Sequence, residues 1–438
     1  MLTKEDNEIL CRVGPGTMMG NLLRRYWTPA LLSSEVPTPD SPPVRCRLLG
    51  EDLVAFRDTY GKVGLLDNYC PHRRVSLFFG RNEECGLRCV YHGWKFDVSG
   101  ACVDMPSEPA ESNFKDKVRI TAYPTHEAGG VIWTYMGPED KQPGFRNFFG
   151  DAFPESEWRA TKIISVCNWM QGLEGNIDSS HIDYLHSGRP PGVEVKEAAD
   201  QVWFDQPGYP PPGSRTPRSH SPTLEMEDTW YGFRYAGLRK TPNGYTNARV
   251  TDIILPFYTL VAPVYGPLGG DNFLVMVPID DHSFWRLGFA TTSTPVPEDP
   301  RLASLQAIIA QYGIKERNQW ADNDYLIDRD AQKTSTYTGI SGIAQQDLAV
   351  TESMGTIGDR TKEHLGTTDR AVIRMRQKLI NAAKDLANGI EPADVDPSLP
   401  WDRIRSAERN LDEGEDWRML GTEEDPLVRQ LETDEVHG

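Results

Sequence analysis

Two short segments, each with one cysteine and one histidine, restrict this chain more than any other feature. The first is Cys70-Pro71-His72 and the second is Cys89-Val90-Tyr91-His92. Two thiolates and two imidazoles on this frame are typical of a Rieske [2Fe–2S] centre, in which cysteines hold one iron and histidines the other. A structural zinc site more often pairs like ligands, as C-x2-4-C followed by H-x3-5-H. The spacing therefore predicts a Rieske cluster, with Cys85 as a rival ligand because it is close to Cys89.

A second motif indicates another metal further along the chain. It comprises Asp178, His181 and His186. Two histidines and a carboxylate from a distant part of the chain form the facial triad that binds mononuclear Fe(II) and leaves positions open for O2. On an ideal helix, five steps would place the histidines about 140° apart, so we expect the helix to be distorted or to end near Ser187-Gly188. Asp178 precedes His181 by three residues and is placed to hydrogen-bond its imidazole. The alternative is an ordinary polar helix whose two histidines face solvent. The cysteine–histidine segments earlier in the chain make this alternative less favoured.

Together the two motifs resemble the α subunits of Rieske non-haem iron aromatic ring-hydroxylating oxygenases, along nearly the whole chain. The resemblance is most specific in residues 70–94, 167–186 and 345–369. The last stretch is similar to the phthalate dioxygenase branch, which also includes phenoxybenzoate dioxygenases and related O-demethylases. This resemblance implies that Asp347 is the third iron ligand. The rival carboxylates are Asp324, Asp328, Asp330 and Asp359.

The resemblance also implies how electrons reach the iron. Asp178 would contact His92 of a neighbouring subunit, which predicts a ring-shaped homotrimer or dimer of trimers. No G-x-G-x-x-G follows a strand in this sequence, so we expect a separate flavin/iron–sulfur NAD(P)H reductase to supply the electrons. Arg73 and Arg74 could help to dock it, although simple solvated charges are an equal alternative.

The expected activity is hydroxylation of an aromatic carboxylate, phthalate- or phenoxybenzoate-like, with O2. An O-demethylating monooxygenase of methoxylated aromatic acids is the alternative within the enzyme class. A Rieske electron-transfer protein is the non-catalytic alternative, but such a protein needs neither the two distal histidines nor the long region around them.

The length of the chain predicts more than one domain, because 438 residues exceed what one hydrophobic core usually serves. We expect an α+β protein with an N-terminal helix and an all-β Rieske domain in residues 1–155. A helix-on-antiparallel-sheet catalytic domain should occupy residues 156–390. The acidic residues 391–438 are expected to form a solvated tail or a subunit-contact arm.

Several elements are predictable from local patterns. Thr3 and Asp6 predict a capping box that opens a helix ending near Val13. Alternating residues predict strands and periodic ones predict helices. The expected strands lie in residues 44–66, 131–135, 248–255 and 273–277, and the expected helices in residues 302–312 and 367–387, the latter capped by Thr367 or Thr368 and stopped by Gly389. Residues 205–222 are too rich in proline and glycine for regular structure.

Charge and composition exclude other functions. A net charge of −18 disfavours nucleic-acid binding, which requires a basic surface. No apolar run reaches the length of a membrane span, and the N-terminus does not have the pattern of a signal peptide. Seven cysteines, an odd number with two required as free thiolates, indicate a reducing, cytoplasmic location.

A substrate carboxylate in a dry pocket would need a cationic partner. Arg249 alternates with Thr251 and Ile253 in a strand-like stretch, so its charge would lie on an inward face. It is the first candidate, and Arg239 and Ser179 follow it. The alternative for Arg249 is an edge-strand arginine that pairs with Asp252 or faces solvent.

Overall fold

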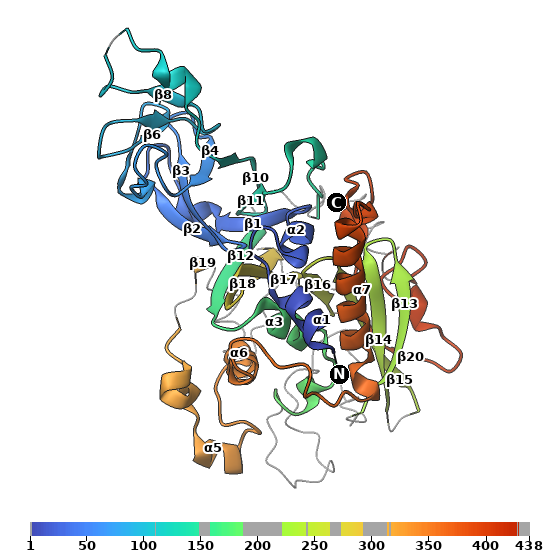
Figure 1. Cartoon of the computed structure of the whole chain (residues 1–438). Coiled ribbons are helices and arrows are strands. Elements are labelled where there is room, and N and C mark those ends of the chain that lie inside the picture. The colour runs from blue at the N-terminus through green and yellow to red at the C-terminus, as the bar shows by residue number, and fades with distance from the viewer. Residues whose placement is uncertain are drawn as a thin grey trace, which may run out of the picture.

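The computed structural model describes residues 2–109, 111–148, 158–186, 221–241, 244–262, 273–291, 313–314, 317–426 and 428. Figure 1 shows a small β lobe, coloured blue to teal, that projects from a larger lobe of helices and a broad sheet. The two expected architectural parts are therefore present, and the fold is α+β.

The small lobe consists of two short antiparallel sheets. One has the order β2 (Val44–Leu48), β3 (Glu51–Arg57), β4 (Val63–Asp67) and β9 (Ala122–Tyr123). The other has the order β5 (Arg81–Glu83), β6 (Gly86–Arg88), β7 (Lys95–Phe96) and β8 (Cys102–Asp104). The strands expected between residues 44 and 66 are confirmed. Cys70 and Cys89 belong to the apolar core of this lobe, which also contains Phe56, Leu66 and Phe96.

A three-stranded sheet joins the small lobe to the large one. Its order is β1 (Trp27–Leu32), β11 (Val131–Tyr135) and β10 (Thr125–Ala128), so the strand expected at 131–135 is confirmed. Trp133 of β11 stacks on Tyr258 and Phe289 of the large lobe, with ring centroids 6.4 and 6.1 Å apart. The small lobe is thus fixed to the large one through a shared aromatic core.

The large lobe is organised around a nine-stranded sheet. In spatial order it contains β13 (Thr223–Thr229), β14 (Gly232–Lys240), β15 (Thr246–Ile254), β16 (Tyr258–Val261), β17 (Phe273–Asp280), β18 (Ser283–Thr291), β12 (Trp158–Ser165) and β19 (Gly313–Ile314), while β20 (Glu408–Leu411) pairs with β15. The pairing is antiparallel except between β12 and β19. The strands expected at 248–255 and 273–277 are confirmed in β15 and β17.

Six helices of the large lobe lie within the described residues. They are α1 (Lys4–Cys11), α2 (Met18–Leu23), α3 (Trp169–Ile177), α5 (Arg329–Thr334), α6 (Ile343–Ser353) and α7 (Arg370–Ala387). Helix α3 contacts β16, β17 and β18 and also α6, while α7 contacts α1, α2 and β13. Short 3-10 turns connect many of the elements, at Ser33–Glu35, Leu77–Phe79, Phe114–Lys117, Glu139–Lys141, His181–Asp183, Ala321–Leu326, Thr367–Asp369, Ala393–Val395, Trp401–Arg403 and Trp417–Met419.

Helix ends follow the sequence signals in part. Thr3 Oγ1 accepts a hydrogen bond from the amide of Asp6 at 3.0 Å, which confirms the cap expected for α1. The cap residue of α7 is Asp369 instead of Thr367 or Thr368, because residues 367–369 form a 3-10 turn before the helix. Gly389 follows α7 with φ +87°, a left-handed conformation that suits glycine and ends the helix.

The acidic C-terminal segment packs on the sheet as far as Asp425, and this part is not a solvated tail. Strand β20 pairs with β15, and apolar side chains cover β14 and β15. The covering residues are Ala407, Leu411, Trp417 and Leu420. The helix expected at 302–312 lies outside the described residues, as does nearly all of the loop expected at 205–222. Among the described residues, no helix is long and apolar enough to cross a membrane.

Candidate metal centres

The first cysteine–histidine segment forms a tight loop after β4. The amide of Cys70 donates to the carbonyl of Val75 at 2.9 Å, and the amide of Arg74 donates back to the carbonyl of Cys70 at 2.9 Å. Arg74 has φ +61°, a left-handed turn that the two hydrogen bonds hold in place. The loop therefore presents Cys70 inward and leaves His72 exposed to solvent.

The second segment forms a matching loop between β6 and β7. The amide of Cys89 donates to the carbonyl of Trp94 at 2.8 Å, and the amide of Gly93 donates to the carbonyl of Cys89 at 3.0 Å. Gly93 has φ +78° and supplies the left-handed residue of this loop. Two loops of similar construction thus hold the four candidate cluster ligands.

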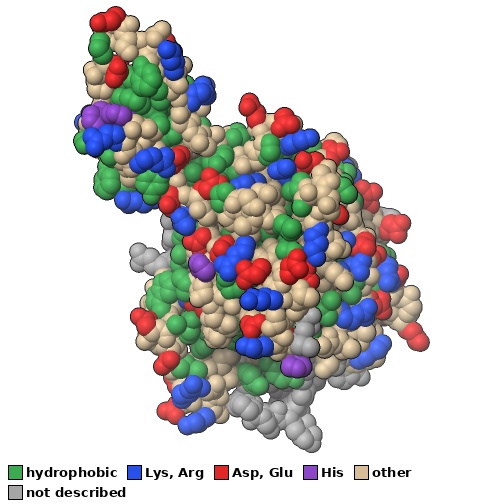
Figure 2. Space-filling view, in the orientation of Figure 1, with side chains coloured by type: hydrophobic (Ala, Val, Ile, Leu, Met, Phe, Trp, Pro, Cys, Tyr) green, Lys and Arg blue, Asp and Glu red, His purple; other side chains and the backbone are tan. Residues whose placement is uncertain are grey.

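The structure brings these four side chains together. The imidazoles of His72 and His92 lie with centroids 4.4 Å apart, and His72 stacks on Trp94 at 4.4 Å. The proximity of the two thiols lowers the pKa of Cys89 and raises that of Cys70. Two adjacent buried thiols beside two outer imidazoles fit a Rieske cluster. Figure 2 shows histidine side chains at the surface of this lobe.

Cys85 lies apart from this group. It is in the turn between β5 and β6, whereas Cys89 begins the loop at the other end of β6. The amide of Cys85 donates to Thr59 Oγ1 at 2.9 Å. A rival role for Cys85 in the cluster therefore has no geometric support.

The second candidate metal site follows α3, and its local structure differs from the expected one. Helix α3 begins at the cap residue Asn168 and ends at Ile177, well before Ser187. Asp178 Oδ1 accepts a hydrogen bond from the amide of Ser180 at 2.7 Å, and this turn ends the helix. The amide of Leu185 then donates to the carbonyl of His181 at 2.7 Å, closing a single turn. His181 and His186 therefore lie on either end of a separate turn, and helical periodicity does not govern their spacing.

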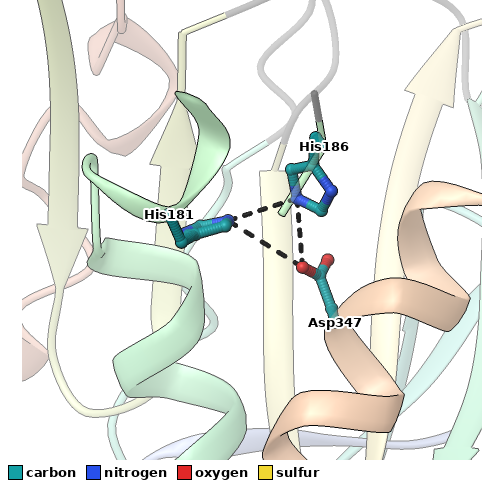
Figure 3. Close-up of side chains that lie close together, drawn as sticks. All are labelled: His181, His186 and Asp347. Atoms are coloured by element: carbon teal, nitrogen blue, oxygen red, sulfur yellow. Dashed lines mark hydrogen bonds and ion pairs between the residues drawn. The ribbon is translucent and has the colours of Figure 1, made fainter. Parts of the chain in front are cut away.

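Figure 3 shows how this turn and α6 meet. His181 Nε2 lies 3.2 Å from His186 Nε2, and Asp347 Oδ1 lies 3.1 Å from His186 Nε2 and 3.8 Å from His181 Nε2. In the part of the chain that the structure describes, these residues form a group whose ligand atoms all lie within 4.8 Å of one another. Two imidazoles and one carboxylate that converge in this way fit a mononuclear Fe(II) site.

The four rival aspartates have other surroundings. Asp328 caps α5, with Oδ1 accepting from the amides of Asp330 and Ala331. Asp324 and Asp330 are exposed. Asp359 is exposed and binds Thr361 and Lys362.

Arg286 neutralises part of the charge at Asp347. Its Nη1 lies 3.3 Å from Asp347 Oδ2, whereas Oδ1 is the oxygen nearest the two histidines. Burial alone would raise the pKa of Asp347, but the hydrogen bond with His186 and the charge of Arg286 lower it below its ordinary value. The carboxylate form, which a metal requires, is therefore the stable one.

Asp178 lies behind His181, as expected from the sequence. Its Oδ2 is 3.6 Å from His181 Nδ1, beyond hydrogen-bond distance but within the range of an ion pair. Burial raises the pKa of Asp178, but its contact with His181 outweighs this effect and the net shift is downward. Asp178 is thus an ionised group beside His181.

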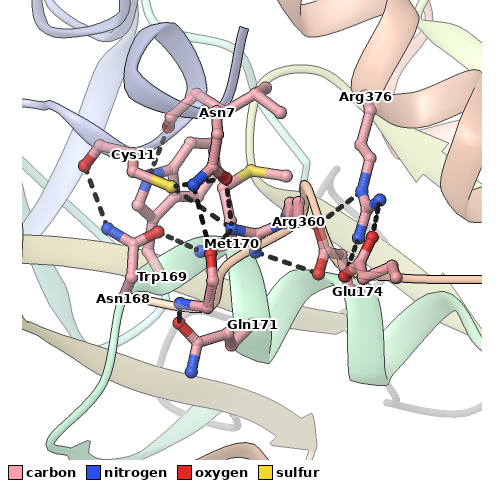
Figure 4. A network of polar contacts seen from close by, with 12 residues as sticks. Asn7, Cys11, Asn168, Trp169, Met170, Gln171, Glu174, Arg360 and Arg376 are labelled. Atoms are coloured by element: carbon pink, nitrogen blue, oxygen red, sulfur yellow. Dashed lines mark hydrogen bonds and ion pairs between the residues drawn. The ribbon is translucent and has the colours of Figure 1, made fainter. Parts of the chain in front are cut away.

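A buried polar network holds α3 in position (Figure 4). Glu174 of α3 accepts hydrogen bonds from Arg360 Nε at 2.8 Å and from Arg376 Nε at 2.7 Å. Arg360 also donates to Asn7 Oδ1 at 3.0 Å, and Gln171 Nε2 donates to the carbonyl of Thr351 at 2.8 Å. The helix that precedes the two histidines is therefore fixed to α1, α6 and α7.

The arginines predicted to bind substrate have protein partners. Arg249 Nε lies 3.4 Å from the buried carboxylate of Glu408 on β20, across a paired register position. Arg239 is fully buried and binds Asp183 Oδ2 at 2.9 Å and Ser179 Oγ at 3.2 Å. Arg239 and Ser179 thus brace the turn that carries His181. Because the charges of both arginines are already neutralised, we do not assign them to a substrate carboxylate.

Sequence reasoning missed two residues at this centre, Arg286 and Gln346. Gln346 Oε1 lies 2.7 Å from His186 Nδ1. Its position directly before Asp347 was the available signal. Arg286 belongs to a strand far from both motifs in sequence, so no local pattern marks it.

The comparisons with known proteins cover both lobes. A model of the Rieske [2Fe–2S] domain matches residues 26–124, and a model described as LigXa C-terminal domain like matches residues 134–437. The second match covers more than half of the chain. An electron carrier with only a cluster domain would not possess this second region.

Curated relatives match nearly end to end. The oxygenase subunit of phthalate 4,5-dioxygenase from Pseudomonas putida is 41% identical, over 95% of this chain and 94% of that protein. The oxygenase subunit of 3-chlorobenzoate-3,4-dioxygenase from Comamonas testosteroni is 38% identical, over 95% and 97%. The oxygenase subunit of 5,5'-dehydrodivanillate O-demethylase from Sphingobium sp. is 33% identical, over 91% and 85%.

Solved structures share the fold at low sequence identity. Dicamba monooxygenase bound to dicamba has a TM-score of 0.57 at 17% identity, over 84% of this chain and 99% of that one. The oxygenase in the oxygenase–ferredoxin complex of carbazole 1,9a-dioxygenase has a TM-score of 0.55 at 19% identity, over 85% and 95%. These likenesses concern the arrangement of the chain alone.

Proposed function

This chain belongs to the Rieske non-haem iron oxygenases of the phthalate dioxygenase branch, and on that premise we propose that its substrate is an aromatic carboxylate. It is the oxygenase subunit of such a system, with a Rieske cluster and a mononuclear iron as cofactors. The observation that carries the proposal is the convergence of His181, His186 and Asp347 beside the cationic Arg286. The relatives named for phthalate and 3-chlorobenzoate support the same substrate class.

We assign the metals to side chains as follows. Cys70, His72, Cys89 and His92 hold the cluster, and His181, His186 and Asp347 hold the iron. The iron supplies the activation of O2 when it is bound. The protein supplies ligand geometry: the turn after α3 presents both imidazoles, and α6 presents the carboxylate.

Arg286 is the arginine that we propose for recognition of the substrate anion. Among the described residues the one polar partner of its guanidinium is Asp347, whose charge is shared with His181 and His186, whereas the carboxylates that pair with Arg239 and Arg249 belong to neither candidate metal site. Phe284 lies on the face of β18 that meets α3 at Gly172, and Arg286 lies two residues further on the same face. A guanidinium at that place can share its donors between Asp347 and a bound carboxylate.

The experiment is an oxygen-uptake assay with the purified protein, a flavin/iron–sulfur reductase and NADH. Phthalates, phenoxybenzoates and methoxybenzoates are the test substrates, with the corresponding uncharged amides as controls. Coupled O2 uptake and a hydroxylated product are expected with at least one acid, and consumption of an amide at the rate of its acid would refute the carboxylate. Arg286→Ala should raise KM by roughly one to two orders of magnitude, for a charged hydrogen bond of about 1.5–3 kcal/mol. Arg249→Ala is the matched control and should leave KM unchanged.

O-demethylation is a second candidate function. The similarity to the 5,5'-dehydrodivanillate O-demethylase subunit favours it, because both activities use the same pair of metal centres. Formaldehyde released from a methoxybenzoate would identify demethylation, while a diol product from a phthalate would identify dioxygenation.

We further propose that electrons cross between chains of a homotrimer or dimer of trimers. The two candidate metal centres lie in different lobes (Figure 1). In this scheme Asp178 of one chain contacts His92 of the next, and a separate reductase serves the cluster.

Complementation tests the crossing. One chain carries Cys89→Ser and lacks the cluster, and the other carries Asp347→Ala and lacks the iron. Co-expressed and purified as mixed oligomers, the two inactive chains should regain turnover. Mixed oligomers without activity would show that electrons stay within one chain.

A further inference from the structure

Gln346 is a buried residue that contacts one of the candidate iron ligands. Its side-chain oxygen Oε1 lies 2.7 Å from His186 Nδ1, and its nitrogen Nε2 donates to the carbonyl of Ile340 at 2.8 Å. A backbone carbonyl can only accept hydrogen bonds. The Ile340 carbonyl therefore fixes the amide so that its oxygen faces the imidazole.

This arrangement determines the protonation pattern of the imidazole. Because Gln346 Oε1 can only accept, His186 Nδ1 carries a proton, and Nε2 holds the free electron pair once it gives up the proton that it shares with Asp347. That electron pair faces Asp347 Oδ1 and His181 Nε2, at 3.1 and 3.2 Å. It is the arrangement in which His186 can bind a metal.

His181 lacks an equivalent hydrogen bond. Among the described residues its buried Nδ1 has no hydrogen-bond partner, and Asp178 Oδ2 lies 3.6 Å away. The two imidazoles are thus supported by different groups, one by a neutral amide within hydrogen-bond distance and the other by a more distant carboxylate. A neutral acceptor makes the imidazole a weaker electron donor than a carboxylate would.

A second contact holds the same turn. Tyr184, between the two histidines in sequence, meets the ring of Tyr337 at a centroid distance of 5.8 Å. Residues 337–340 therefore touch the histidine turn directly through Tyr337 and indirectly through Gln346. This contact limits how far His186 can move when its hydrogen bond is lost.

We infer that Gln346 is a positioning residue for the iron, which sets the tautomer and orientation of His186 and does so with a neutral amide. The inference rests on the proposed iron site, but not on the identity of the substrate. Two replacements separate the functions of the amide. Gln346→Leu removes the acceptor at similar size, and Gln346→Glu keeps an acceptor but adds charge.

The test measures the iron site without turnover. Fe(II) is titrated into protein depleted of mononuclear iron, with the cluster absorbance as an internal reference, and the nitric oxide adduct of the iron is recorded by EPR. Gln346→Leu should weaken Fe(II) binding by roughly 10- to 100-fold and broaden the EPR signal. Gln346→Glu should bind Fe(II) at least as tightly as the wild type but shift the signal. Gln345→Leu, one residue away, is the matched control and should change neither.

Wild-type affinity together with an unchanged EPR signal in Gln346→Leu would overturn the inference. If that variant does not fold, Gln346→Glu decides, because an unshifted signal would show that residue 346 does not act on the iron. These outcomes differ from failure of the proposed function. In that case the wild-type protein would bind Fe(II) but oxidise no aromatic acid.

Discussion

Replacement of Glu174 by glutamine should destabilise the catalytic lobe strongly. The carboxylate accepts hydrogen bonds from Arg360 Nε and Nη2 and from Arg376 Nε, at 2.8, 3.0 and 2.7 Å. The side chains of Arg360 and Arg376 are only 1% and 3% exposed. Removal of the charge on Glu174 would leave Arg360 buried without a counter-ion, while Arg376 would keep Glu363.

The magnitude follows from these contacts. Loss of one partner of a buried ion pair costs about 3–5 kcal/mol, and glutamine retains one acceptor oxygen, so we expect a loss of about 3 kcal/mol. For a domain of this size, 1 kcal/mol corresponds to about 2–4 °C, which predicts a fall in melting temperature of roughly 6–12 °C.

The effect should depend on pH. Burial raises the pKa of Glu174, but Arg360 and Arg376 lower it below its ordinary value. A carboxylate with a lowered pKa in the folded state stabilises the protein fully above its unfolded pKa, about 4.3 for glutamate. This stabilisation is lost as the pH falls through the folded pKa. The wild type and Glu174→Gln should therefore differ most near neutral pH and converge below about pH 4.

Scanning calorimetry at several pH values measures both effects. Glu423→Gln is the matched control, because Glu423 pairs with Arg403 at 2.8 Å on the surface, where both side chains are mostly exposed. That variant should shift the melting temperature by no more than about 1 °C. Equal shifts in the two variants, or a Glu174→Gln protein that melts with the wild type at pH 7, would refute the reasoning.

Three further predictions concern other groups. Asp347→Ala should lose mononuclear iron by metal analysis but keep the visible Rieske spectrum, and loss of iron in Asp330→Ala instead would contradict the assignment of the ligand. His92→Cys should keep a cluster of lower reduction potential in a redox titration, because a thiolate adds negative charge to the iron; a raised potential would count against the assignment of His92. Burial raises the pKa of Asp252 to about 6, so this carboxyl costs stability as the pH rises from about 4 to 6. The melting temperature of Asp252→Asn relative to the wild type should thus be higher at pH 7 than at pH 4.5, and a constant difference would show that Asp252 does not titrate in this range.

The sequence predicted those parts of the molecule whose determinants are local. The alternation in residues 44–66 predicted β2, β3 and β4, a further strand was expected at β11, and the cap at Thr3 predicted the start of α1. The two cluster loops were predictable because each joins a cysteine and a histidine within a few residues.

The parts that were missed depend on contacts between distant residues or on competing local interactions. Helix α3 ends at Ile177 because the Asp178 side chain binds the Ser180 amide, a turn that helical periodicity does not reveal. Arg249 faces Glu408 only because β20 pairs with β15, and no local pattern predicted that pairing.

The candidate iron site could be predicted only in part, because it too depends on contacts between residues that are distant in sequence. The spacing of His181 and His186 identified them as candidate iron ligands. Asp347 lies far from them in sequence, and only the family resemblance identified it as the third ligand. Its place beside the histidines depends on the packing of α6 against α3.

The contact of α1 with α7 has a consequence for synthesis of the protein. Helix α1 is made almost at once, but it packs on a helix that begins only at Arg370. At about 5–20 residues per second, the ribosome needs roughly 20–70 s to travel from Cys11 to that point. During this interval Asp6 of α1 has no Lys384 of α7, with which it forms an ion pair at 2.9 Å in the finished protein. The large lobe therefore cannot complete its packing around α1 until α7 has been made.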